Sequence, residues 1–271
     1  MESLNLLVQA SSATLLTIAA VLVLVPFERM WPRLALNRRW SGRRRAILAV
    51  ALATTVLVLV FQQNIQTGLI RAMVPLQITS IAKWPVPDWL VIVLSFVLLD
   101  FLNYLMHNIS HRLPVLWRLH SVHHADKHVT ALTGLLHHPL EFIPVAIFVL
   151  FFAVVLGVPV LLYVFYGFAA ALHNAFSHSE IALPVKLDKA LRNFIITPDM
   201  HRTHHSVVVA EGNSNFGTIL SIWDRMFGTY TQHPGTGEAN LAMGLSASEA
   251  PRSFTPSGLL AHPFLSKRNT R

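Results

Sequence analysis

The stretch that decides the fold is AILAVALATTVLVLVFQQNIQTGLI, which runs from Ala46 to Ile70 without a charged residue. A helix that crosses a bilayer needs about 20 predominantly apolar residues, so this stretch is long enough to cross. Residues 5–27 form a second uncharged run, and residues 89–106 form a third in which Asp100 carries the only charge. The three runs predict three membrane-spanning helices.

A fourth uncharged run covers residues 142–176, which is too long for one ordinary helix. Gly157-Val158-Pro159 stands in its middle, and Gly and Pro together break helices. We therefore expect two short helices folded back as a re-entrant-type hairpin. The composition agrees with a membrane protein, because 13% of the residues are charged, against about 25% in a soluble domain. The sequence predicts an all-α integral membrane protein with three spans, this hairpin and a histidine-rich helical cap.

The basic residues predict the orientation in the membrane. Of the net charge of +8, a large part comes from arginines between the first two runs: Arg29, Arg33, Arg38, Arg39, Arg43, Arg44 and Arg45. Cytoplasmic loops carry an excess of Lys and Arg, so no nucleic-acid partner is needed to explain the charge. The chain opens Met1-Glu2-Ser3, without the basic start of a signal peptide. We expect an uncleaved first span, an outside N-terminus and a cytoplasmic cap.

The chain has no internal repeat, and we predict one membrane domain over residues 1–271. Residues 1–106 hold the N-terminal spans, residues 107–234 the histidine-rich catalytic region with the 142–176 hairpin, and residues 235–271 a tail. There is no cysteine, which excludes disulfides, iron–sulfur clusters, thiolate-ligated haem and Cys-type zinc sites. Arginine outnumbers lysine about three to one, a bias associated with GC-rich bacterial genomes, so a bacterial plasma membrane is the expected location.

Histidines are concentrated in one region of the chain. Of the 15 histidines, most fall between His107 and His205, in three clusters with helical spacing. The clusters are His107 and His111; His120, His123 and His124; and His201, His204 and His205. Residues three and four apart share a helix face, with Cβ atoms about 5–6 Å apart, so each cluster presents its imidazoles toward one point. This pattern indicates metal binding.

The number of clustered imidazoles predicts two metal ions, because one zinc ion takes three or four ligands. The zinc-protease pattern H-E-x-x-H is absent, and so are the Glu-x-x-His pairs of carboxylate-bridged di-iron bundles. A bis-His haem would leave the clusters unexplained. Imidazole suits iron, zinc and copper alike, so the residues alone leave the metal open. We expect no metal role for His128, His137, His233 or His262.

These residues resemble the fatty acid hydroxylase superfamily, which includes sterol desaturases, sterol C4-methyl oxidases, fatty acid hydroxylases and alkylglycerol monooxygenase. The similarity covers residues 100–230 and rests on Asp100-Phe-Leu-Asn-Tyr104-Leu-Met-His107-Asn-Ile-Ser-His111-Arg112, Trp117-Arg-Leu-His120-Ser-Val-His123-His124, His138-Pro139-Leu-Glu141, His178-Ser179, Thr197-Pro-Asp199-Met-His201-Arg-Thr-His204-His205, Asn215-Phe-Gly217 and Trp223-Asp224-Arg-Met-Phe-Gly228-Thr-Tyr230. The resemblance implies two iron ions, O2 as oxidant, a lipid substrate (sterol, fatty acyl or alkyl lipid) and hydroxylation or desaturation of a C–H bond. It also implies that His138 and His178 join the three clusters as ligands.

The chain departs from the family's usual pattern at two places. Leu136 and His137 stand where Arg and an aromatic residue often precede His-Pro, and Glu180 stands where Asn often follows the later His. His173 adds an imidazole five residues before His178. These departures concern the fourth ligand set and the contacts to the substrate headgroup.

Two aspartates are candidates for orienting the ligands. Asp100 lies two helical turns before His107, and Asp199 lies two residues before His201. Either carboxylate could accept an imidazole N–H and fix the tautomer of the ring; for Asp100 the alternative is a polar contact to a neighbouring helix. We expect Asp224 and Arg225 to form an ion pair that folds the C-terminal cap over the metals.

The predicted activity is O2-dependent oxidation of a lipid by a membrane enzyme. The chain has no Gly-rich dinucleotide fingerprint and no cysteine, so electrons are expected from a separate ferredoxin, reductase or cytochrome b5-like protein. Two other functions use the same histidines. A membrane zinc hydrolase would work without O2, and a metal transporter would place its ligands within the spans.

Overall fold

The computed structural model of the chain describes residues 12–33, 41–237 and 240–265. Its helices, in chain order, are α2 (Ser12–Met30), α3 (Ser41–Phe61), the π-helical turn η1 (Gln62–Gln66), α4 (Thr67–Met73), the 3-10 turns η2 (Val74–Leu76) and η3 (Ile81–Lys83), α5 (Asp88–Arg112), α6 (Pro114–His124), the 3-10 turns η4 (Ala131–Leu135) and η5 (Pro139–Glu141), α7 (Phe142–Val155), α8 (Val160–Ser177), α9 (Val185–Leu191), α10 (Pro198–His204), α11 (Val209–Gly212), α12 (Ile222–Met226) and α13 (Pro256–Leu265). Within the described ranges, β pairing is limited to isolated bridges. The predicted all-α class is confirmed.

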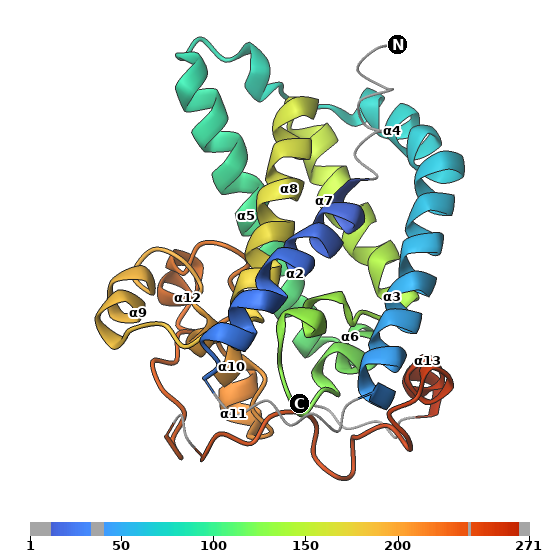
Figure 1. Cartoon of the computed structure of the whole chain (residues 1–271). Coiled ribbons are helices and arrows are strands. Elements are labelled where there is room, and N and C mark those ends of the chain that lie inside the picture. Colours follow the sequence, from blue (N-terminus) through green and yellow to red (C-terminus); the bar gives the residue numbers. More distant parts are fainter. Residues whose placement is uncertain (1–11, 34–40, 238–239, 266–271) are drawn as a thin grey trace.

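Within the part of the chain that the structure describes, three helical segments are long and apolar enough to cross a membrane: Gly42–Gln66, Asp88–Arg112 and Val160–Ser177. The first two correspond to the uncharged runs that predicted the second and third spans. The predicted first span begins at residue 5, and its residues 5–11 lie outside the described part of the chain. Helix α2 covers the rest of that run and lies obliquely across α8 (Figure 1).

The predicted break in the fourth apolar run is confirmed at Gly157. Helix α7 ends at Val155 and α8 begins at Val160. Gly157 has a φ of +62°, and a Cβ on it would meet the Cα of Ser80 at 2.5 Å, so only glycine fits this turn. The hairpin is asymmetric: α8 has 18 residues and rises about 27 Å, close to the thickness of a bilayer core. The expectation of two short helices therefore holds for α7 but not for α8.

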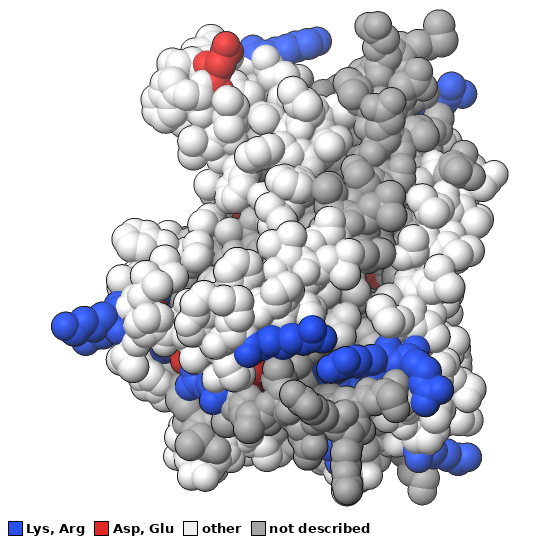
Figure 2. Space-filling model, viewed as in Figure 1, with Lys and Arg blue, Asp and Glu red and all other residues white. Residues whose placement is uncertain are grey.

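The long helices pack through several apolar clusters and expose other apolar side chains on the outside. Buried residues of α5, α7 and α8 pack together, among them Leu99, Val149 and Tyr166. Leu52 and Phe165 are among the apolar side chains that are exposed on the outside of the helices. In Figure 2 the middle of the visible face is largely free of Lys, Arg, Asp and Glu, and most of the basic side chains lie in a band below it. This distribution fits a protein whose long helices are surrounded by lipid.

The short helices gather at one end of the long helices. In Figure 1, α6 and α9 to α13 all lie at the lower end, where α5 ends and α3 begins. Glu28 of α2 holds two of the connecting segments there, because its buried carboxylate accepts hydrogen bonds from the backbone N–H groups of Ala131 and Glu180. This end of the molecule contains the three histidine clusters.

Candidate metal centre

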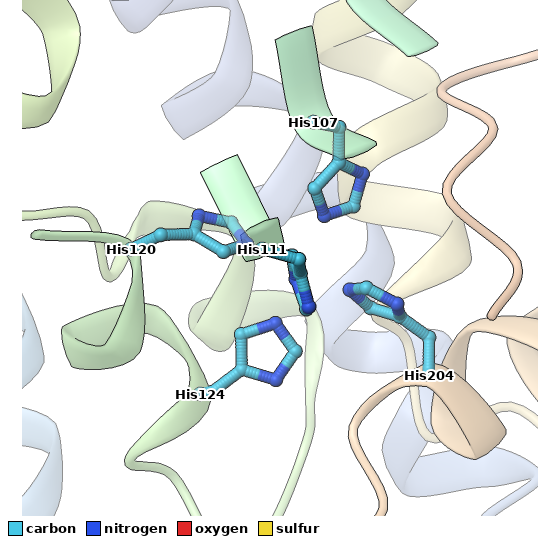
Figure 3. A group of neighbouring side chains, drawn as sticks. All are labelled: His107, His111, His120, His124 and His204. Atoms are coloured by element: carbon cyan, nitrogen blue, oxygen red, sulfur yellow. The ribbon is translucent and has the colours of Figure 1, made fainter. Parts of the chain in front are cut away.

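The imidazoles of five histidines form the first of two groups, called site A here: His107, His111, His120, His124 and His204. Each residue offers one ring nitrogen, and these nitrogens lie within 4.8 Å of one another. The five rings come from α5, α6 and α10, and Figure 3 shows that they surround a common space. His107 and His111 are four residues apart on α5, and Pro114 starts a new helix, α6, that returns His120 and His124 to the same place.

Four further histidines form the adjacent group, site B: His123, His178, His201 and His205. Both H-x-x-H-H clusters contribute to both sites. His120 and His124 of the first cluster enter site A while His123 enters site B, and the second cluster supplies His204 to site A and the other two to site B. The rings of His124 and His205 stack at 4.4 Å between centroids, so the two sites share a wall.

The hydrogen bonds behind site A determine which nitrogens face inward. Nδ1 of His107 donates to the carbonyl oxygen of Phe216 at 2.9 Å, and Nδ1 of His204 donates to that of Ser214 at 2.7 Å. A carbonyl oxygen only accepts, so Nδ1 carries the proton and Nε2 carries a lone pair. The Nε2 atoms of His107, His120 and His204 are buried and have no hydrogen-bond partner among the described residues. Several lone pairs therefore point into one dry space, which is costly unless a cation is bound there.

In site B, ring nitrogens of neighbouring histidines face each other at the distance expected between two ligands of one metal ion. Nδ1 of His178 donates to the carbonyl oxygen of Asn174 at 2.7 Å, and Nδ1 of His123 donates to that of Leu136 at 3.2 Å. Their Nε2 atoms are therefore unprotonated, yet they lie 3.0 Å apart, and Nε2 of His201 lies 2.8 Å from that of His178. Two nitrogens bound at right angles to one ion at about 2.1 Å would be roughly 3 Å apart.

The protonation of these rings also fits metal binding. Burial, followed by the charges of neighbouring imidazoles, holds the pKa values of five ligand candidates well below the ordinary value, namely His123, His124, His201, His204 and His205. Burial lowers the pKa of His178 to about 3. Neutral imidazoles are the form that binds metals. The donor set of the two sites therefore fits a pair of imidazole-bound ions.

A carboxylate that the sequence did not single out supports site A. Oε1 of Glu141 accepts the Nδ1 proton of His120 at 2.7 Å, and the same carboxylate contacts Nδ1 of His137 at 3.2 Å. Burial lowers the pKa of His137, but Glu141 reverses this and raises it above the ordinary value. Glu141 therefore orients a candidate ligand, the role we expected for Asp100 or Asp199. Its place in the His138-Pro139-Leu140-Glu141 motif was a signal by which it could have been found.

His138 lies apart from both sites. Its Nδ1 accepts the backbone N–H of Leu140 at 3.2 Å and caps the turn η5, while Nε2 lies 3.2 Å from the carbonyl oxygen of Leu260 in α13. With both nitrogens engaged, the ring offers no lone pair to an ion. His173 is also engaged elsewhere, because its Nε2 faces the carbonyl oxygen of Ile196 at 2.9 Å.

Asp100 contacts protein groups other than imidazoles. Its buried carboxylate accepts hydrogen bonds from Tyr166 Oη at 3.0 Å, Trp223 Nε1 at 2.8 Å and the backbone N–H groups of Ile219 and Leu220 at 3.1 Å. The expectation that Asp100 orients a ligand is therefore not met, and the alternative contact to a neighbouring helix is found. Asp100 ties α5 to α8 and to the segment that follows Phe216, whose carbonyl holds His107.

Asp199 and Asp224 also differ from their expected roles. Asp199 forms an ion pair with Arg33 and does not contact an imidazole. Asp224 accepts hydrogen bonds from the backbone N–H groups of Phe216 and Gly217 at 2.7 and 2.8 Å, and its burial raises the pKa to about 6. Arg225 instead lies over the Tyr230 ring and donates to the Arg192 carbonyl. Asp224 thus folds the cap by holding a loop, without the predicted ion pair to Arg225.

A cavity of about 150 Å³ opens onto the two sites. Its walls include imidazoles of both sites, together with Asn103, Val145 and Thr218. Two larger apolar spaces adjoin it between the long helices. Val145 lines all three spaces, so the apolar spaces lie next to the candidate metal ligands.

The fold and the site define a class of helical membrane protein in which two adjacent groups of histidines that could hold metal ions lie at one end of the long helices. Residues 92–229 match the fatty acid hydroxylase family, and the chain belongs to this family. The match contains every histidine of sites A and B.

Three curated relatives show what the chain is similar to. An ornithine lipid hydroxylase, OlsE of Rhizobium tropici, is 29% identical over 189 residues, which are 68% of this chain and 53% of that protein. An alkylglycerol monooxygenase of Danio rerio is 31% identical over 51% of this chain and 30% of that protein. A fatty acid hydroxylase, vlmA of a Lecanicillium species, is 26% identical over 63% of this chain and 50% of that protein. The chain thus spans about half the length of these relatives or less. No solved structure is significantly similar to it.

Proposed function

We propose that the chain is a membrane-bound, non-haem di-iron enzyme that uses O2 to hydroxylate or desaturate a C–H bond of a lipid. The observation that carries the proposal is the pair of adjacent sites into which buried, unprotonated imidazole nitrogens point. One ion would be held by site A and one by site B. The ring contacts between His124 and His205 and between His123 and His124 would keep the two ions close, as two-metal catalysis requires.

The protein residues would bind the ions, orient the ligands and keep water out. Carbonyl groups of Phe216, Ser214 and Asn174 fix ring orientations from behind, and Glu141 does so for His120. Bound iron supplies the activation of O2 that removal of hydrogen from an unactivated C–H bond needs. The burial of both sites excludes the water that would compete with the lipid.

The substrate class is proposed from the place of the site and from the relatives. The relatives' names specify an ornithine lipid, an alkylglycerol and a fatty acid, which share long alkyl chains. The cavity at sites A and B adjoins apolar spaces between membrane-embedded helices. A lipid that enters from the bilayer could present an alkyl carbon there while its polar end lies elsewhere.

We further propose that the histidine-rich end faces the cytoplasm of a bacterial cell and receives electrons there from a separate ferredoxin, reductase or cytochrome b5-like protein. The arginines before and at the start of α3 support this orientation, because cytoplasmic loops are rich in Lys and Arg. Most basic side chains on the face shown in Figure 2 also lie at this end. A basic surface would attract an acidic electron-transfer partner and accelerate its association.

The test is turnover of a long-chain lipid by iron-loaded protein in lipid nanodiscs, with a chemical reductant, in the presence and absence of O2. The proposal predicts an oxidised lipid only when O2 is present, loss of product in His204→Ala and retention of product in His128→Ala, whose exposed side chain lies outside both sites. Conversion without O2 would favour a zinc hydrolase, and metal uptake into vesicles without lipid conversion would favour a transporter.

A further inference from the structure

An apolar cavity of about 190 Å³ lies between α3, α7 and α8. Its wall is formed largely by aromatic and aliphatic side chains, including Phe61, Phe142, Val149, Leu150 and Tyr163. The rings of Phe61 and Phe142 meet edge to face at 5.4 Å and close one side. The backbone of Gly167 also lines this cavity, and a Cβ there would enter open space. The apolar wall of the cavity suits an alkyl chain.

The apolar cavity shares lining residues with the cavity at the metal centre. Val145 and Asn103 line both this cavity and the one that contains imidazoles of sites A and B. Val145 also lines the third space, together with His137 and Glu141. The apolar cavity and the cavity at the metal centre therefore adjoin at Val145 and Asn103.

Two glutamines make this apolar cavity chemically unusual. Gln62 and Gln66 both line it, from the π-helical turn that interrupts the α3–α4 helix. They are buried, with 8% and 7% of their surfaces exposed. Oε1 of Gln62 has no hydrogen-bond partner among the described residues. A buried polar atom without a partner costs about 1–3 kcal/mol, and π-helical turns occur frequently at functional sites.

The glutamines lie at a fixed distance from the metal centre, measured along the helix that carries them. Oγ1 of Thr54 in α3 donates to the carbonyl oxygen of His137 at 2.8 Å, which places Thr54 at the level of the centre. Gln62 follows eight residues later on the same helix. At about 1.5 Å per residue the two levels differ by roughly 12 Å. A group bound at Gln62 would therefore lie several methylene lengths from the carbon that is oxidised.

We propose that Gln62 and Gln66 bind an uncharged polar group of the lipid that carries an N–H or O–H donor, such as a secondary amide or a hydroxyl. The open acceptor of Gln62 requires a donor, and the apolar walls disfavour a charged group. Binding at this point fixes how far the chain extends past Val145, and so selects the carbon that reaches the metals. This inference rests on the proposed function where it concerns which carbon is oxidised. Binding of the polar group at the two glutamines can be measured without turnover.

The test measures equilibrium binding to metal-loaded protein in nanodiscs, by competition against a diazirine-bearing N-alkyl amide that cross-links to the cavity. Two matched pairs of competitors are compared: N-decyldecanamide with decyl decanoate, and a long-chain secondary alcohol with the ketone of the same skeleton. Wild type is expected to bind the donor-bearing member of at least one pair about tenfold more tightly, the equivalent of one net hydrogen bond. Equal binding within both pairs, or no binding, would overturn the proposal.

Substitutions of the two glutamines test whether these residues cause the preference for the donor-bearing competitor. Gln62→Leu should bring the ratio within the pair close to one, and Gln66→Leu should reduce it. Asn64→Leu is the matched control, because Asn64 lies in the same turn but is exposed and donates to the carbonyl oxygen of Val60. Retention of the full preference in both glutamine variants would contradict the assignment. Metal content checks that each variant is folded, and the wild-type comparison stands without them.

Separate measurements of binding and of turnover distinguish a failure of the glutamine assignment from a failure of the proposed function. If the donor preference is found but no lipid is oxidised under O2, the binding site stands and the proposed function fails. If lipids are oxidised but the preference is missing, the glutamine assignment fails alone.

Discussion

Sites A and B are built from the same kind of residue but are held in different ways. In site A, the rings of His107 and His204 are fixed from behind by backbone carbonyls, and their inward nitrogens are buried without a hydrogen-bond partner among the described residues. In site B, the inward nitrogens of His178 and His123 already lie 3.0 Å apart, lone pair against lone pair. Backbone carbonyls hold rings of both sites from behind, but the directly opposed lone pairs of site B are disfavoured unless a cation lies between them.

The largest expected effect is the loss of one ligand from either site. His124→Ala in site A and His205→Ala in site B should each reduce lipid oxidation by at least about 100-fold, because the two ions act as one centre. Product quantified by mass spectrometry, together with bound metal, is the measurement, and His128→Ala serves as the control. Near-normal turnover in one of the two variants would show that the sites work independently.

Removal of the metals should show the difference between the sites. Chelation should lower the unfolding temperature by about 5 °C or more, because ions that bind only the folded state stabilise it, and added iron should restore it. In His178→Ala the drop should be smaller, since one of the opposed lone pairs is gone. Thermal unfolding of detergent-solubilised protein measures both, and an equal drop in wild type and variant would argue against a cation between the opposed nitrogens of site B.

Glu141→Gln should weaken the metal at site A and leave site B unchanged. Gln keeps the size of the side chain but not the charge that holds the Nδ1 proton of His120. Loss of such a supporting group typically costs about 10–100-fold in metal affinity. Competition with a chelator of known affinity should therefore resolve one weakened and one unchanged ion. Weakening of both ions to the same degree would contradict the separate support of the two sites.

The local parts of this architecture could be predicted from the sequence. Spacings of three and four residues bring histidines to one helix face, and Gly157-Val158-Pro159 breaks the apolar hairpin where the structure does. The division of His123 and His124 between two sites was not predictable in the same way. It depends on how α10 docks against α6, which no local spacing encodes.

The carboxylates Asp100 and Glu141 also show that local spacing in the sequence does not predict long-range contacts. Asp100 is correctly spaced for His107, but Trp223 and the backbone of residues 219–220 reach it first, from more than a hundred positions later in the chain. Glu141 reaches His120 because the turn η5 folds back on α6. His138 was implied by resemblance alone, and the docking of α13 gives it a different partner. Long-range docking thus decides which of several suitable side chains supports a ligand.

Asp100→Asn should affect stability more than metal binding. The variant loses the charge that accepts four hydrogen bonds, and we expect a loss of about 3 kcal/mol in the free energy of unfolding. Denaturant unfolding measures this, with metal content as the second readout. Loss of metal without loss of stability would restore Asp100 to the ligand-orienting role.

The smallest expected effect is that of His138→Ala, which lies beside the sites but in neither. Losing the cap of η5 and the contact to Leu260 should cost about 1 kcal/mol, with metal content and turnover unchanged. Loss of one ion in this variant would place His138 among the ligands and redefine the sites.

The central claim, that two ions are bound per chain, is tested most directly by metal analysis. The protein would be expressed with iron, solubilised gently and kept from adventitious zinc, and metal per chain would be measured by mass spectrometry alongside O2-dependent turnover. We expect about two iron ions per folded chain. One ion or none on a folded, homogeneous sample would contradict it.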